Sequence, residues 1–154
     1  MNTVPESPKP QAVTPAALGW RVLALIYDVL PLLGIWFAVA ALMLALRLGQ
    51  PVVPGGLSAF AEQVLLLLAT FAYFGISWRR GGQTLGMRAW RLRLLDAQGG
   101  APSWRQILLR AVVAPFSLAL FGVGFLWSLF ERERRSWHDL ASNTVIVRLP
   151  KPKK

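Results

Sequence analysis

Residues 21–46 read RVLALIYDVLPLLGIWFAVAALMLAL, a run whose two charged side chains both lie in its first eight positions. Its last eighteen residues, 29–46, carry no charge, which approaches the roughly 20 residues that a helix needs to cross about 30 Å of hydrocarbon. Two more apolar blocks follow, at 57–78 and 107–130. A chain of 154 residues has too little polar sequence to cover three such blocks as buried soluble helices. We therefore expect an all-α membrane protein with a hairpin of two transmembrane helices, at about 20–46 and 57–78.

The positive charges predict the orientation of this hairpin. The formal charge of +10 alone could suggest nucleic-acid binding. However, six cationic residues lie in the loop after the second block, and seven more follow the third. Basic residues beside apolar spans are typical of cytoplasmic segments that face anionic lipid. We expect a multi-pass protein of the cytoplasmic (inner) membrane, with its N-terminus in the cytoplasm, anionic lipids as partners, and no nucleic acid.

The remaining sequence divides into short segments around a membrane domain at 16–149. Residues 1–15 contain four prolines and few aliphatic side chains, and predict a disordered arm. This arm lacks the pattern of a cleavable signal peptide, so the first span is expected to be an uncleaved anchor. Residues 47–56 are rich in proline and glycine and predict a turn outside the bilayer. Residues 150–154 form a basic tail.

The third apolar block, 107–130, is interrupted by Pro115 and the glycines of 122–124, and carries Arg110 near its start. A straight crossing would place the basic tail outside. It would also place two strand candidates on opposite sides of the membrane. In 89–96, apolar and charged residues alternate, and 144–149 is rich in β-branched residues. We therefore predict a broken or re-entrant segment, or one that lies along the inner surface, with a small cytoplasmic two-stranded β element. A plain third crossing is the alternative.

Asp28 is the most informative polar residue, because a carboxylate within an apolar span is costly by about 2.5–3.5 kcal/mol. Arg21 lies two helical turns earlier on nearly the same helix face, and Arg110 is an equally suitable charge partner. A buried ion pair would merely fix the packing of segments. A proton or ion site is the other interpretation, because burial favours the neutral form of a carboxylate.

The sequence contains few of the residue patterns that are typical of enzymes. The chain has no cysteine and one histidine, His138, so no metal site or cofactor is expected. His138 and Asp139 favour a helix start or an interface over catalysis. The loop containing Gly82, Gln83, Thr84 and Gly86 lacks the Gly-Lys-Ser/Thr ending of a phosphate-binding loop. It is interpreted as flexible backbone beside the membrane.

The joint pattern resembles a known family. It comprises Arg21, Asp28, the motif GQTLG at 82–86 followed by RLRLLD, and HDLA at 138–141 before TVIV. This combination resembles the RDD family of bacterial membrane proteins, named for one arginine and two aspartates. By position, Arg21, Asp28 and Asp139 match those three. The resemblance covers about 15–149 and implies a membrane domain with two spans, for which transport of unknown ligands has been suggested.

The sequence and the resemblance are consistent with two functional hypotheses. In the first, Asp28 forms a polar site with Arg21, and with Arg110 and Asp139 as further members, in a subunit of an ion or small-solute transport system. Two spans cannot enclose a pathway, so a homo-oligomer or a larger membrane partner is expected. In the second, the protein is a non-transporting scaffold or accessory protein whose buried charges fix its assembly and whose cytoplasmic strands recruit a partner.

Overall fold

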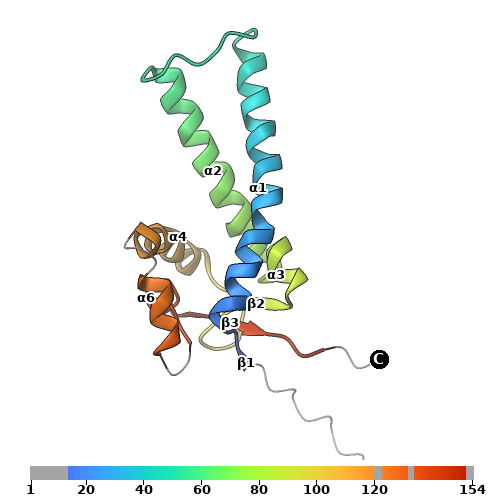
Figure 1. Ribbon diagram of the computed structural model, residues 1–154, viewed down its shortest axis with the longest axis vertical. Coiled ribbons are helices and arrows are strands. Elements are labelled where there is room, and N and C mark those ends of the chain that lie inside the picture. The colour runs from blue at the N-terminus through green and yellow to red at the C-terminus, as the bar shows by residue number, and fades with distance from the viewer. Residues whose placement is uncertain (1–13, 120–122, 132–133, 152–154) are drawn as a thin grey trace, which may run out of the picture.

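Two long helices form a hairpin that rises from a smaller part made of short helices and a sheet, called the base here (Figure 1). The computed structural model describes residues 14–119, 123–131 and 134–151. Helix α1 spans Leu18–Leu46 and helix α2 spans Leu57–Gly81, close to the two predicted spans. Within the described residues, these two helices are long and apolar enough to cross a membrane by length and composition.

A three-stranded antiparallel sheet lies at the base, in the order β1-β3-β2. Strand β2 (Leu92–Asp96) pairs with β3 (Thr144–Arg148) in the region where two strands were predicted, with Leu94 opposite Ile146. The expected number of strands was wrong, because β1 (Thr14–Pro15) also pairs with β3. These two residues belong to the arm predicted to be disordered, and residues 1–13 lie outside the described residues.

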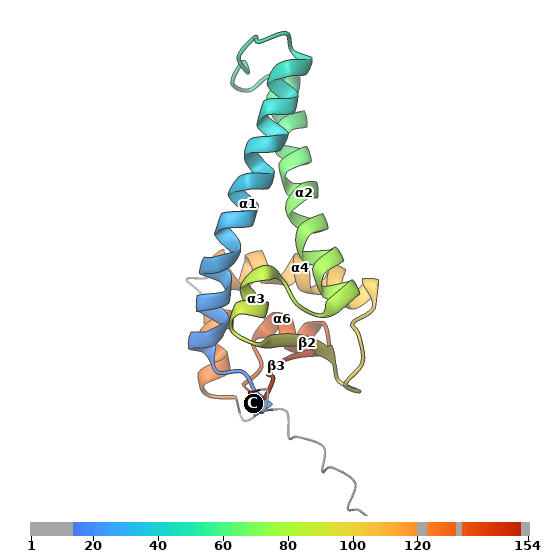
Figure 2. The same cartoon turned by 90° about the vertical axis from the view of Figure 1, so that its right-hand side faces the viewer.

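The third apolar block does not form one continuous helix. Helix α4 (Trp104–Ala119) runs across the base of the hairpin (Figure 2), and is followed by α5 (Val123–Leu126) and a 3-10 helix (Trp127–Leu129). The sequence had suggested that Pro115 interrupts the third block. This prediction was wrong, because Pro115 lies inside α4. Two short helices, α3 (Leu85–Ala89) and α6 (Trp137–Ala141), complete the base.

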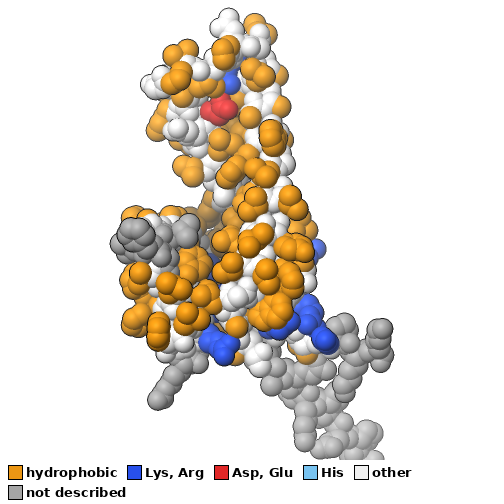
Figure 3. Space-filling view, in the orientation of Figure 1, with side chains coloured by type: hydrophobic (Ala, Val, Ile, Leu, Met, Phe, Trp, Pro, Cys, Tyr) orange, Lys and Arg blue, Asp and Glu red, His pale blue; other side chains and the backbone are white. Residues whose placement is uncertain are grey.

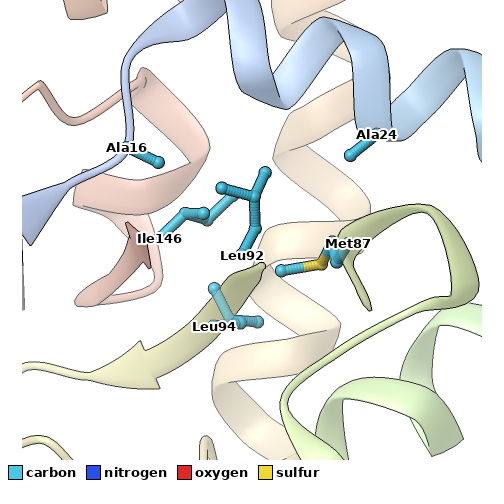
Figure 4. Close-up of a cluster of buried hydrophobic side chains, with 6 residues drawn as sticks. All are labelled: Ala16, Ala24, Met87, Leu92, Leu94 and Ile146. Atoms are coloured by element: carbon cyan, nitrogen blue, oxygen red, sulfur yellow. The ribbon is translucent and has the colours of Figure 1, made fainter. Parts of the chain in front are cut away.

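The hydrophobic core lies in the base and not between the two long helices. Figure 4 shows buried side chains from α1, α3, β2, β3 and the link between β1 and α1 converging there: Ala16, Ala24, Met87, Leu92, Leu94 and Ile146. Trp20, Trp78 and Trp90 pack against this cluster. By contrast, apolar side chains cover the outside of the hairpin (Figure 3), and Phe37 is 74% exposed. Because water would oppose such exposure, the hairpin requires lipid or other helices around it.

Gly86 sets how closely α3 approaches α1. A Cβ atom at this position would collide with the backbone carbonyl oxygen of Ala24 and lie 3.0 Å from Cγ of Asp28. Both neighbours belong to a rigid helix turn, and the nearest atom is backbone, so no side-chain rotation could relieve the contact. A glycine is therefore required for α3 to pack here.

We predict that Gly86→Ala separates α3 from α1 and destabilises the protein by about 1–3 kcal/mol, the usual range for overpacking. Thermal unfolding of the detergent-solubilised protein measures this as a lower Tm. Gly19→Ala is the matched control, because a Cβ atom at Gly19 would meet no atom within 4 Å. Equal Tm values for the two variants would contradict this account of α3 packing.

Candidate functional site

The two aspartates that the sequence analysis singled out, Asp28 and Asp139, lie in separate polar clusters. The Asp28 cluster consists of Asp28, Tyr73, Thr84 and Gly86. The Asp139 cluster consists of Arg21, Arg110, Ser136 and Asp139. Both carboxylates are buried, with residue exposures of 2% for Asp28 and 0% for Asp139.

Asp28 accepts three hydrogen bonds, all from uncharged donors. The Tyr73 hydroxyl donates to Oδ1 at 2.6 Å, and the backbone N–H of Gly86 donates to the same oxygen at 2.8 Å. The Thr84 hydroxyl donates to Oδ2 at 2.5 Å. A single carboxylate thus joins α1, α2 and the start of α3. Hydrogen bonds to a charged group are stronger than neutral ones and offset part of the cost of burial.

The loop after α2 is ordered, contrary to the expectation of flexible backbone. Gly82 ends α2 in the left-handed conformation, with a φ of 67°, which glycine adopts without steric cost. The Gln83 side-chain amide donates to the carbonyl of Leu92 at 2.7 Å. Thr84 then caps α3 by accepting a hydrogen bond from the N–H of Met87. The motif therefore turns the chain and presents two donors to Asp28.

Asp139 is held by two arginines. Nη1 of Arg21 donates to Oδ2 at 2.5 Å, and Nη1 of Arg110 donates to Oδ1. The hydroxyl and the backbone N–H of Ser136 also donate to Oδ2, at 2.7 and 3.0 Å. Ser136 and Asp139 form a capping box at the start of α6, which agrees with the helix-start role expected from the sequence. This cluster joins α1, α4 and α6.

Arg21 also connects α1 to the backbone of the base. Its Nε donates to the carbonyl of Ala16 at 3.1 Å, and its Nη2 donates to the carbonyl of Arg134 at 2.7 Å. Arg110 donates to the Thr144 hydroxyl at 3.0 Å and lies over the Trp78 ring at 5.3 Å. Each guanidinium therefore has several partners in addition to the carboxylate, as a buried cation requires.

The pairing of Asp28 with Arg21 or Arg110 was expected and is not what the structure shows. Both arginines bond to Asp139 instead. Two turns of helix separate Arg21 from Asp28, and the Arg21 side chain extends toward the base, where Asp139 and two carbonyl groups lie. Asp28 faces α3, whose hydroxyl and backbone donors replace a cation.

His138 lies beside the Asp139 cluster and is kept neutral mainly by burial. Burial, and then the nearby Arg110, lower the pKa of His138 to about 3, although Asp139 acts in the opposite direction. Its Nε2 lies 3.3 Å from the Ser136 hydroxyl, and its ring is 4.6 Å from that of Phe125. For Asp139, burial raises the pKa, but Arg110 and Arg21 outweigh it and hold the pKa below its usual range.

Two members of these clusters, Tyr73 and Ser136, were missed from the sequence. The Ser136-x-x-Asp139 spacing is a capping-box signal and could have identified Ser136. Tyr73 gave a weaker signal, a hydroxyl within an apolar span. Within the described parts of the chain, His, Asp and Glu form no group of three that could hold a metal ion.

The depressed pKa of His138 predicts an acid-dependent loss of stability. In the unfolded chain His138 binds a proton near its ordinary value of 6.5, whereas the folded protein resists protonation until about pH 3. Its contribution is therefore present above pH 6.5 and declines as the pH falls between these two values. We expect Tm to drop from pH 7.5 to about pH 5, and we expect His138→Gln to reduce this slope. An unchanged slope in His138→Gln would assign the acid sensitivity to another group.

One family comparison covers most of the chain. The model of the RDD family matches residues 15–143, which include both clusters and strand β2, and it ends just before β3. No curated protein and no solved structure matches the chain. Because the match extends over far more than half of the sequence, the chain belongs to the RDD family.

Proposed function

We propose that this RDD family member is a membrane-embedded subunit of an ion or small-solute transport system, with Asp28 as its exchangeable carboxylate. The observation that carries the proposal is the difference between the two aspartates. The described partners of Asp28 are all neutral, so they supply no fixed countercharge that would exclude a proton or a small cation. Family membership and two apolar helices support a membrane location.

Asp139 is unsuited to the same role. Two arginines neutralise it, and they hold its pKa below the usual range, so a proton or cation would have to displace a buried guanidinium. Breaking a buried pair of this kind costs about 3–5 kcal/mol. The Asp139 cluster is therefore assigned to assembly, and Asp28 to exchange.

The position of Asp28 also suits a transport role. It is the last charged residue before the uncharged stretch 29–46, whose eighteen residues span about 27 Å as a helix. Polar pairs continue along the α1–α2 interface toward the far end of the hairpin. Nε1 of Trp36 donates to the Thr70 hydroxyl at 2.9 Å, and Arg47 pairs with Glu62 at 2.9 Å beyond it.

A single copy does not supply a closed pathway, because two helices cannot surround one. The apolar side chains of α1 and α2 are largely exposed, as Leu30 at 72% and Leu67 at 70% illustrate. We therefore propose that the hairpin packs against further copies of the chain or a larger membrane partner. No enzymatic step enters this proposal.

The scaffold alternative is favoured by one observation. The hydrogen bonds of Asp28 join α1, α2 and α3, so the same carboxylate serves as a structural connection whether or not it exchanges a proton. A scaffold would need only this connection, together with the sheet as a surface for a partner. The two functions differ in what happens when the charge of Asp28 is removed and its shape is kept.

We predict that Asp28→Asn remains inserted and assembled but loses ion-dependent proton flux by at least about tenfold, because an amide keeps the shape but cannot bind an exchangeable proton. The measurement uses inverted membrane vesicles, in which a pH-sensitive dye reports the response to added NaCl or KCl. Loss of assembly without a separate loss of flux would favour the scaffold.

Asp139→Asn is the comparison variant in this experiment. It leaves Arg21 and Arg110 buried without a countercharge, so we expect loss of the folded, assembled protein. Identical behaviour of the two asparagine variants would remove the distinction between an exchange site and an assembly site.

We also propose that the base faces the cytoplasm in the inner membrane. Strands β1 and β3 pair, so residues near both ends of the chain lie on the same side of the hairpin. We predict that reporters fused before Met1 and after Lys154 both respond as cytoplasmic, whereas one inserted at 51–54 responds as external. A C-terminal reporter active only outside would contradict this orientation and would imply a third crossing.

A further inference from the structure

A hollow of about 280 Å³ lies between the end of α2 and α3, apart from both polar clusters. Its wall combines two cationic side chains with apolar and small ones. The wall includes Ile76, Ser77, Arg80, Gly81, Leu85 and Arg88.

The two arginines, Arg80 and Arg88, face this hollow from different elements. Nη2 of Arg88 lies 3.7 Å from where a Cβ atom of Gly81 would stand, so its guanidinium lies against the last turn of α2. Arg21, Arg47 and Arg110 each pair with a carboxylate, whereas among the described residues Arg80 and Arg88 form no ion pair. Two positive charges therefore line one hollow without an ion pair in the described part of the chain, which favours binding of an anion there.

The apolar side of the hollow faces the hairpin. The backbone N–H of Leu85 donates to the Tyr73 hydroxyl at 3.3 Å, so Leu85 lies beside α2 two turns before Arg80. Leu85 is 58% exposed and Ile76 is 44% exposed. Figure 3 shows the same order on a larger scale, with hydrophobic side chains over the hairpin and basic ones gathered at its lower end. The hollow thus combines apolar side chains with two cationic ones near the base of the hairpin.

We propose that this hollow binds an anionic phospholipid, with its phosphate between Arg80 and Arg88 and its acyl chains along Ile76 and Leu85. Guanidinium groups bind phosphate through paired, charge-assisted hydrogen bonds. The Ser77 hydroxyl in the wall supplies a further polar group. A soluble phosphate would use the arginines but would leave the exposed leucine and isoleucine without a role. This lipid site does not depend on whether Asp28 exchanges ions.

The test titrates the full-length protein in detergent micelles with phosphatidylglycerol or phosphatidylcholine and counts bound lipids by native mass spectrometry. The variant is Arg80→Gln/Arg88→Gln. The matched control, Arg91→Gln/Arg105→Gln, removes the same charge from positions outside the hollow. We expect the wild type to prefer phosphatidylglycerol. The Arg80/Arg88 variant should lose about 30-fold in its affinity, because each arginine near an anionic headgroup contributes roughly a factor of five, while the control should change far less.

Three results would overturn the proposal. Equal losses in the two double variants would show a diffuse basic surface and not a site. Equal affinity of the wild type for the two lipids would exclude recognition of an anionic headgroup. Displacement of phosphatidylglycerol by inorganic phosphate at similar concentration would identify a site for a soluble anion. Thermal unfolding of each variant, measured in parallel, separates lost lipid binding from lost folding.

Discussion

The ion pairs of Asp139 with Arg21 and Arg110 are the interaction on which the base of this protein depends. The three residues are almost fully buried, at 0%, 7% and 3% exposure, so each charge would be costly without the others. Because they come from α6, α1 and α4, their mutual neutralisation requires these helices to meet at one point. The sheet is then held nearby, since Arg110 also bonds to Thr144 at the start of β3.

The Asp28 cluster makes a second connection of a different kind. Its three donors are neutral and come from α2, the loop and α3, so it fixes the short α3 against the hairpin without balancing a charge. The glycine at 86 is needed for the same contact, because only a residue without Cβ brings its N–H so close to the turn of α1. Arg21 and Asp139 thus belong to a connection in which positive and negative charges neutralise each other, whereas Asp28 belongs to one with neutral donors.

The sequence predicted those features that depend on neighbouring residues. The uncharged stretch 29–46 is by itself long enough to indicate a membrane span, and the alternation of apolar and charged residues in 90–94 indicates a strand directly. It did not predict the charge partners, because 118 residues separate Arg21 from Asp139 and no local pattern encodes that contact. It likewise missed β1, since two residues form too short a strand to show a period, and their pairing depends on the exposed edge of β3.

The proposed exchange can be followed to a single oxygen atom. Oδ1 of Asp28 accepts from the backbone N–H of Gly86, a donor that cannot reverse its direction, so a proton on this oxygen would oppose it. Among the described residues, Oδ2 accepts from the Thr84 hydroxyl alone, and this hydroxyl can rotate. A proton would therefore reside on Oδ2, with the Thr84 hydroxyl turned away. Since Thr84 also caps α3 through the N–H of Met87, the proposed exchange site and the start of that helix share one side chain.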